Sequence, residues 1–204
     1  MDNILAILDM NAGILVQIRT IPFIPQSDTM TDNTVYRKDP LSTVLFFGLA
    51  GSGKSYVADL ISEHTGWYVY HADEDITMEM RQALAQHRPF DDEMRDRYFS
   101  IIVDKIHALK NTHAHLLVTQ AVYKQRHRNF LLSHIPDMEL IYVQADDDLI
   151  EHRLLARNGE VSAKSSSALR NDFEFPSAEI KKIVNDKDGQ YILQQWDELF
   201  PQQN

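Results

Sequence analysis

The chain has 204 residues, of which 44% are hydrophobic and 25% charged, a composition typical of a soluble globular protein with one sizeable core. It contains no cysteine, which excludes disulfides, thiolate metal sites and a cysteine nucleophile, and which fits a cytoplasmic location. The net charge of −10 argues against broad nucleic-acid binding, and no apolar run is long enough to span a membrane.

The first 41 residues differ from the rest of the chain. Their short apolar runs have no positively charged start before them, which argues against a signal peptide. Pro22, Pro25 and a polar stretch over residues 26–33 are typical of a linker. We therefore expect an N-terminal extension over residues 1–41 and a single domain over residues 42–204. Two interpretations of the extension stay open: the native start is Met30, or an amphipathic helix packs on the domain.

The most specific motif is a glycine-rich stretch, Gly48-Leu49-Ala50-Gly51-Ser52-Gly53-Lys54-Ser55. It joins an apolar run over residues 44–47 to a helical pattern, which is the strand–loop–helix context of a phosphate-binding P-loop. Glycines let backbone N–H groups turn toward a phosphate, and the helix N-terminus adds partial positive charge. Lys54 would reach the β- and γ-phosphates of ATP, and the Ser55 hydroxyl would ligate Mg²⁺. The alternative is an ordinary glycine-rich turn.

Strand patterns alternate with helical patterns along the rest of the chain. Strands are expected over residues 44–47, 67–70, 116–118 and 140–143, and helices over residues 54–64 (closed by Gly66), 73–86, 91–110, 124–134, 146–157, 178–184 and 191–199. Apolar strands between amphipathic helices predict an α/β fold with a parallel sheet and helices on both faces. A ligand should then bind at the carboxyl ends of the strands.

Asp73 follows the second predicted strand. In a P-loop sheet the end of this strand can face the γ-phosphate, so a carboxylate there would orient an acceptor hydroxyl or accept its proton. The alternative is that Asp73 only caps the helix that follows it.

Arg153 and Arg157 lie one helical turn apart, immediately before a polar, serine-rich segment over residues 158–175. We interpret that segment as a mobile lid whose closure excludes water from the transferred phosphoryl group. The two arginines would neutralise the charge that develops on this group. The alternative is a solvated helix face paired with carboxylates such as Glu151.

Several other polar residues have two readings. Four cationic residues near the ends of elements would either bind an anionic substrate or be ordinary surface charges. They are Arg95, Lys124, Arg126 and Arg128. His113 and His115 share a strand face but have no further metal ligands beside them, and the acidic run over residues 146–148 suits a helix start better than a metal site.

Two absences narrow the class of P-loop protein. Residues 185–188 do not match the Asn-Lys-x-Asp pattern of guanine recognition, which disfavours a regulatory GTPase. The third predicted strand is followed by Thr119-Gln120 rather than by the acidic pair of a large motor ATPase. A small kinase of the nucleoside-monophosphate-kinase type fits what remains.

Four segments resemble the gluconate kinase family, small P-loop kinases that are also similar to shikimate kinases. They are the P-loop; the stretch from Asp73 through Pro89-Phe90-Asp91-Asp92 to Arg95; residues 121–128, similar to the family's Ser-Ala-Leu-Lys-x-x-Tyr-Arg; and residues 148–159, similar to its Leu-Ile-x-x-Arg-Leu-x-x-Arg-x-Gly. Together they span residues 44 to about 176.

The chain departs from the family pattern on the substrate side. A His-Pro pair after the family's Asp is missing, Ala83-Leu84 replaces a Lys-Met pair, His87 replaces a glycine, and Glu160-Val161 replaces a His-Phe pair. The phosphate cradle keeps the family pattern.

The resemblance implies an ATP- and Mg²⁺-dependent enzyme of carbohydrate metabolism that phosphorylates a hydroxyl of a sugar acid, with gluconate giving 6-phosphogluconate. It places Asp73, Arg95 and Lys124 or Arg128 near the substrate, Arg153 and Arg157 on the nucleotide and lid, and it implies a homodimer. Two alternatives stay open. One is a kinase for shikimate, a nucleoside or another small alcohol, and the other is a nucleotide-binding regulatory protein without turnover.

Overall fold

The computed structural model describes residues 41–86, 88–156 and 170–201, which all belong to one compact unit. The predictions for the N-terminal extension, for Arg157 and for most of the lid segment fall outside these ranges. In the part of the chain that the structure describes, no helix combines the length and the apolar character needed to cross a lipid bilayer.

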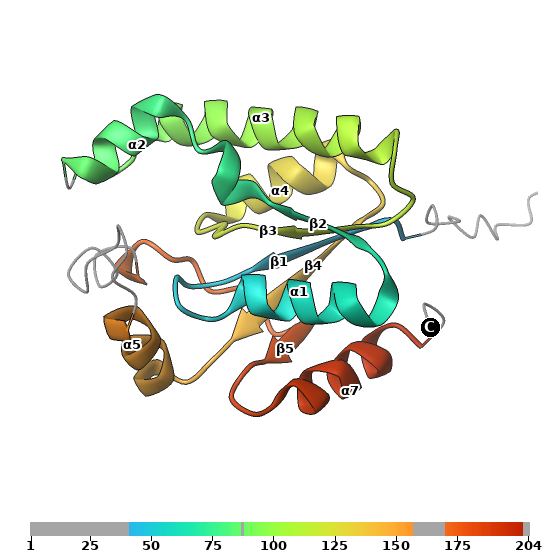
Figure 1. Ribbon diagram of the computed structural model, residues 1–204. Coiled ribbons are helices and arrows are strands. Elements are labelled where there is room, and N and C mark those ends of the chain that lie inside the picture. The colour runs from blue at the N-terminus through green and yellow to red at the C-terminus, as the bar shows by residue number, and fades with distance from the viewer. Residues whose placement is uncertain (1–40, 87, 157–169, 202–204) are drawn as a thin grey trace, which may run out of the picture. The chain divides into compact units, whose positions relative to one another are not determined.

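A parallel sheet of five strands forms the centre of the described unit (Figure 1). The strands are β1 (Thr43–Phe47), β2 (Tyr68–His71), β3 (Leu116–Thr119), β4 (Met138–Gln144) and β5 (Lys182–Val184). Their order across the sheet is β2-β3-β1-β4-β5. Thr119, the last residue of β3, pairs with Phe46 of β1 on one side and with His71 of β2 on the other. The carboxyl ends of these three strands therefore lie at the same edge of the sheet.

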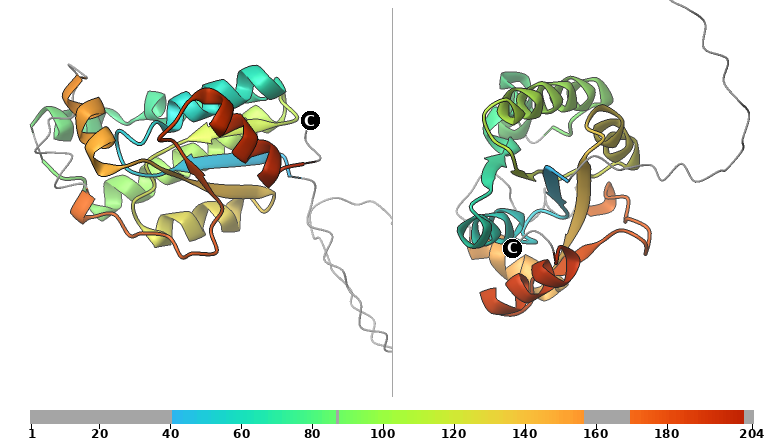
Figure 2. Two further views of the ribbon diagram at one scale, coloured as in Figure 1. Left: turned by 90° about the horizontal axis from the view of Figure 1, so that it is seen from below. Right: turned by 90° about the vertical axis from the view of Figure 1, so that its right-hand side faces the viewer.

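Helices cover both faces of the sheet, as the two views in Figure 2 show. They are α1 (Lys54–Thr65), α2 (Met78–Ala85), α3 (Asp92–Lys110), α4 (Gln125–His134), α5 (Asp147–Ala156) and α7 (Gly189–Leu199), with a 3₁₀ turn, η1, over Ala72–Asp75. Side chains of α3 and α4 pack on one face of the sheet, and those of α1 and α7 on the other. The prediction of a parallel sheet with helices on both faces is confirmed.

The central strand β1 is buried along its whole length because it contributes to both layers of the core. Val44 and Phe46 pack with α1 and α7, whereas Leu45 and Phe47 pack with α3 and α4. This alternation is the period of two that strand geometry imposes, and it explains why the strand is a continuous apolar run.

Two predicted helices are corrected by the structure. Within residues 178–184 the chain forms β5 instead of a helix, since Ile183 is fully buried and Lys182–Val184 pair with β4. The helix predicted over residues 73–86 is interrupted, because Ile76 and Thr77 have non-helical backbones and the Thr77 side chain caps α2 by accepting a hydrogen bond from Met80 N at 3.2 Å. Asp73 therefore lies in the 3₁₀ turn at the end of β2.

Asp137, just before β4, ties three elements together at the opposite edge of the sheet. Its buried carboxylate pairs with Lys110 at the end of α3 and accepts a hydrogen bond from Ser42 just before β1. Burial raises the pKa of Asp137, but the hydrogen bonds from Lys110 and Ser42 outweigh it and hold the pKa below the usual 3.8.

We predict that Asp137→Asn lowers the free energy of unfolding by about 1–3 kcal/mol at neutral pH, because Lys110 loses its buried counter-charge. Since the folded pKa is depressed, the stabilisation is present above the unfolded value of 3.8 and is lost as the pH falls through the folded value. Urea unfolding at several pH values measures the difference between wild type and variant. Asp104→Asn, on an exposed position of α3, is the control and should stay within about 0.5 kcal/mol. A difference that persists in strong acid would argue against this role.

Candidate nucleotide and acceptor site

The P-loop connects β1 to α1 with a backbone that requires glycine. Gly51 and Gly53 have φ values of +83° and +91°, which side-chain-bearing residues rarely adopt. At Gly53 there is also no room, because a Cβ would lie 2.1 Å from Nδ2 of the buried Asn185. The loop therefore forms the narrow backbone cradle that a phosphate group needs.

Lys54 lies over this cradle at the start of α1. Its Nζ donates hydrogen bonds to the carbonyl oxygens of Gly48 and Leu49, at 3.2 Å and 3.0 Å. Ser55 follows in the first turn of α1 with its side chain exposed. An ammonium group, a helix N-terminus and an exposed hydroxyl at one end of a glycine loop fit a Mg²⁺–triphosphate group.

Arg153 of α5 reaches the P-loop from the other side. Its Nη1 donates to the carbonyl oxygens of Gly51 and Ser52, at 3.5 Å and 3.3 Å, and its Nη2 donates to the carbonyl oxygen of Asn185 at 3.3 Å. The structure thus brings Arg153 to the loop where its predicted role requires it, although that role stays a prediction. Arg157 lies outside the described residues.

Asn185 supports the P-loop and was missed by the sequence analysis. It directly follows β5, is 1% exposed, and donates from Nδ2 to the Ser52 carbonyl oxygen at 2.9 Å. Its backbone N–H donates to the Gln144 carbonyl oxygen at 2.7 Å, which fixes it beside β4. The sequence carries no local signal for this role, because it depends on strand β5 pairing with β4.

Asp73 lies at the end of β2 in the turn η1, and its side chain is exposed. Its Oδ1 accepts a hydrogen bond from Gln120 Nε2 at 3.1 Å. The residue that caps α2 is Thr77, so the alternative in which Asp73 serves only as the cap of that helix is wrong. Asp73 and Ala50 of the P-loop line the same cavity.

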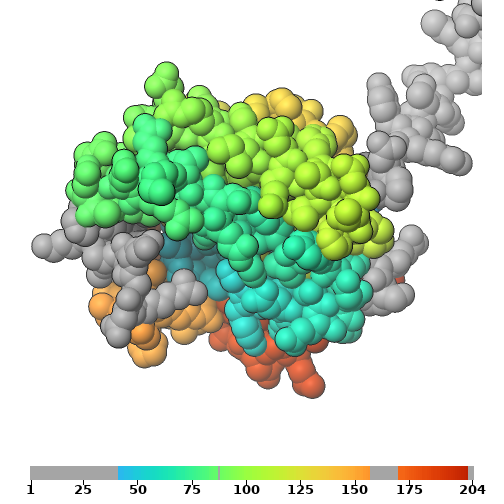
Figure 3. All heavy atoms as spheres, turned by 45° about the horizontal axis from the view of Figure 1, so that its top comes forward, coloured from blue at the N-terminus to red at the C-terminus, as the bar shows by residue number. Residues whose placement is uncertain are grey.

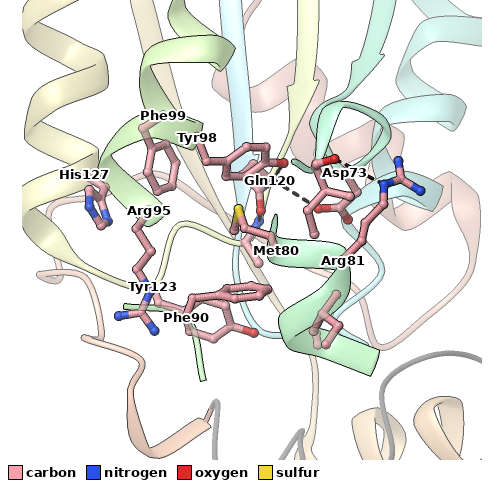
Figure 4. Close-up of a pocket in the computed structure, with 14 residues that line it drawn as sticks. Asp73, Met80, Arg81, Phe90, Arg95, Tyr98, Phe99, Gln120, Tyr123 and His127 are labelled. Carbon is pink, nitrogen blue, oxygen red and sulfur yellow. Dashed lines mark hydrogen bonds between the residues drawn. The ribbon is translucent and has the colours of Figure 1, made fainter. Parts of the chain in front are cut away.

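This cavity, of about 290 Å³, lies between the P-loop and the helices α2 and α3. Figure 3 shows the surface of the segment that follows β1, in blue, recessed below the green α2 and α3. Figure 4 shows the side chains of its wall, and among all the lining residues the aromatic and aliphatic ones outnumber the polar ones. The lining residues are Ala50, Asp73, Ile76, Met80, Arg81, Leu84, Phe90, Arg95, Tyr98, Phe99, Gln120, Ala121, Tyr123 and His127.

Arg95 and Lys124, predicted to contact the substrate, are bridged by one carboxylate. Asp172 Oδ2 lies 2.7 Å from Arg95 Nη2, and Asp172 Oδ1 lies 2.5 Å from Lys124 Nζ. Burial raises the pKa of Asp172, but these two cations outweigh it and hold the pKa below its usual value. Arg95 lines the cavity, whereas Lys124 is not among its lining residues.

Arg128, also predicted to contact the substrate, has a different environment. It is fully buried, with its guanidinium carbon 5.0 Å from the centre of the Phe47 ring and 5.8 Å from that of Phe173, and it donates to the Glu174 carbonyl oxygen. It does not line the cavity. Its place in the core has no local sequence signal, because it depends on distant aromatic rings.

His127 lines the cavity and was not predicted as a site residue. Its ring stacks on Phe99 at 4.4 Å, and its Nε2 lies 2.9 Å from Asp96 Oδ1. Burial lowers the pKa of His127 from its usual value, which favours a neutral ring at physiological pH.

Comparison with known proteins indicates a kinase, although no protein-family model matches the chain. The chain is similar to the thermoresistant gluconokinase of Escherichia coli strain K12, with 29% identity over 117 residues, which cover 56% of this chain and 66% of that protein. It is also similar to a probable gluconokinase of Xenopus tropicalis, with 24% identity over 161 residues, 71% of this chain and 85% of that protein. A solved sugar kinase from a Janibacter species matches with a TM-score of 0.69 at 20% identity, over 78% of this chain and 94% of that one.

These similarities confirm the predicted family resemblance, fold class and enzyme class. The chain resembles gluconokinases, and its fold is that of small P-loop kinases. The predicted enzyme class, an ATP-dependent phosphotransferase, is confirmed at the same level. The matched segment covers just under two thirds of the E. coli protein, so the acceptor and the roles of single residues are proposals.

We predict that Gly53→Ala weakens Mg·ATP binding at least about tenfold, because the new Cβ displaces Asn185 or the loop itself. Gly66→Ala is the matched control: Gly66 also has a positive φ, of +75°, but a Cβ there meets no atom within 4 Å. It should destabilise the fold by about 1–2 kcal/mol and leave ATP binding unchanged. Calorimetric titration and thermal unfolding measure both effects. Equal ATP affinity in the two variants would show that the Gly53 contact is unimportant.

Proposed function

We propose that the protein transfers the γ-phosphoryl group of ATP to a hydroxyl of a small sugar acid, with gluconate as the first candidate and 6-phosphogluconate as its product. The observation that carries the proposal is that Asp73 and the P-loop residue Ala50 line one cavity. A carboxylate and a phosphate cradle facing the same space are what an alcohol kinase needs. The names of the curated relatives support the same acceptor class.

The P-loop performs the nucleotide side of the reaction. Its backbone N–H groups and Lys54 would bind the phosphates of ATP and neutralise charge as the γ-phosphoryl group leaves. Mg²⁺, when bound, supplies further neutralisation of the phosphates, and Ser55 is the side chain placed to hold it. Arg153 would supply positive charge from α5, since its guanidinium already lies on the loop.

Asp73 performs the acceptor side of the reaction. It would accept a hydrogen bond from the acceptor hydroxyl, orient its oxygen toward the γ-phosphorus and take its proton as the new O–P bond forms. Because Gln120 holds Oδ1 of Asp73, the second oxygen, Oδ2, is the one proposed to face the hydroxyl.

Arg95 and Lys124 would bind the carboxylate of a sugar acid. Asp172 bridges them, which supports the proposal that two such cations share one carboxylate group. An acceptor carboxylate would take the place of Asp172. Arg128 is left out of this proposal because it is fully buried against Phe47 and Phe173.

A second acceptor class is favoured by the wall of the cavity. Phe90, Tyr98, Phe99 and Tyr123 contribute aromatic surface, and a ligand with many hydroxyls needs more polar partners than such a wall offers. An alcohol with a flat apolar body, such as a nucleoside, would bury its ring there.

The predicted homodimer stays a prediction that sedimentation can test.

The test of the proposed function is ADP release by the purified protein with Mg·ATP and a panel of acceptors: gluconate, other sugar acids, shikimate and nucleosides. Stimulation by sugar acids supports the first acceptor class, and stimulation by nucleosides alone supports the second. ATP binding without stimulation by any acceptor would favour the regulatory alternative.

We predict that Asp73→Asn lowers kcat with the best acceptor by about 100-fold or more and leaves ATP affinity within about twofold, because general-base catalysis is lost while the phosphate cradle is untouched. Asparagine keeps an oxygen that can accept from Gln120, so the turn should stay intact. Glu74→Gln, the exposed neighbour in the same turn, is the control and should turn over normally. An equal loss of kcat and ATP affinity in Asp73→Asn would mean that Asp73 is mainly structural.

A further inference from the structure

Gln120 lies at the end of β3, between the strand that leads to the P-loop and the strand that leads to Asp73. Its backbone N–H donates to the carbonyl oxygen of Phe46 in β1 at 3.1 Å, which anchors it beside the P-loop strand. Gln120 is 5% exposed, and it lines the cavity next to Asp73 (Figure 4). A buried amide in this position needs partners for its oxygen and for both of its N–H groups.

The partners of Gln120 determine which way its amide points. The carbonyl oxygen of Ala72 can only accept, so the Tyr98 hydroxyl donates to it, at 2.7 Å, and accepts from Gln120 Nε2. The backbone N–H of Ala121 can only donate, so it is paired with Gln120 Oε1. Nε2 is thereby directed toward Tyr98 and Asp73, and its second N–H donates to Asp73 Oδ1 at 3.1 Å.

Tyr98 is suited to anchor this arrangement. Burial raises the pKa of Tyr98 well above its usual value, so that the hydroxyl keeps its proton and goes on donating to Ala72. Tyr98 is 3% exposed and belongs to the core under α3. Gln120 therefore links the exposed carboxylate of Asp73, in a short turn, to a buried residue of the core.

We infer that Gln120 is a positioning residue for the proposed phosphoryl transfer, which holds Oδ1 of Asp73 so that Oδ2 meets the acceptor hydroxyl. This inference rests on the proposed function. An uncharged donor orients the carboxylate without an ion pair, which would stabilise the ionised form and make the carboxylate a weaker base. The titratable groups around Asp73 are Glu74 and Asp75 in the same turn, Tyr70 of β2, Arg81 of α2, Tyr98 of α3 and Tyr123 beyond β3, and Arg95 and His127 line the same cavity.

Two substitutions separate the orienting hydrogen bond from the packing of the side chain. Gln120→Met keeps the volume and removes both polar groups. Gln120→Glu keeps the oxygen that pairs with Ala121 N–H and replaces only the donor that faces Tyr98 and Asp73. Gln82→Met, on an exposed position of α2, is the matched control.

The experiment measures kcat, the KM values for ATP and acceptor, and the pH dependence of kcat. Both variants should lose about tenfold to a hundredfold in kcat, a part of what general-base catalysis contributes, with the KM for ATP within about twofold. In Gln120→Glu two carboxyl groups face each other and share a proton, so the pH below which kcat falls should rise. The control should match the wild type.

A kcat and pH profile in both variants like those of the wild type would overturn the inference. So would a loss of kcat that leaves the pH profile unchanged and is matched by an equal loss of ATP affinity, because that result indicates a structural role.

Failure of the proposed function itself is distinguishable, because the wild type would then turn over no acceptor. In that event NMR of the Gln120 side-chain amide decides: its two proton signals should be protected from water, and Asp73→Ala should deprotect one of them. Unprotected signals in the wild type would overturn the inference.

Discussion

The pairing of β3 with both β1 and β2 is the constraint on which the site depends. Thr119 pairs with Phe46 on one side and with His71 on the other, so that the three strands end at one edge of the sheet. The P-loop leaves β1 at this edge, and the turn that carries Asp73 leaves β2 there. A phosphate cradle and a carboxylate that are separated in the chain thereby line one cavity, with β3 setting the distance between them.

The same edge of the sheet also gathers the residues that hold the cradle in shape. Asn185, at the end of β5, binds the Ser52 carbonyl oxygen, and Arg153 reaches the same oxygen from α5. The loop is thus held by segments from the far half of the sheet, whereas Asp73 is held by Gln120 at the end of β3. The P-loop and Asp73 have separate supports, so substitutions at one need not damage the other.

Local patterns predicted the phosphate cradle, the order of most elements and Asp73, because glycine spacing, helix caps and apolar periods act over a few residues. Gly66 closes α1 with a φ of +75°, as expected from its place after the helical pattern. Strand β5 was not predicted, because a strand of three residues is too short to show a recognisable alternation of apolar and polar residues. The roles of Asn185 and Gln120 and the burial of Arg128 depend on contacts across the sheet, which a single sequence does not display.

The central claim is that the γ-phosphoryl group of ATP is transferred to an acceptor hydroxyl in this cavity, with release of ADP. The most direct measurement is mass spectrometry of the products after incubation of the wild-type protein with Mg·ATP and gluconate. The account predicts a gluconate that carries one added phosphoryl group, formed in equal amount with ADP. ADP formed without any phosphorylated acceptor would show that water, not an acceptor hydroxyl, receives the phosphoryl group at this cavity, and would contradict the account.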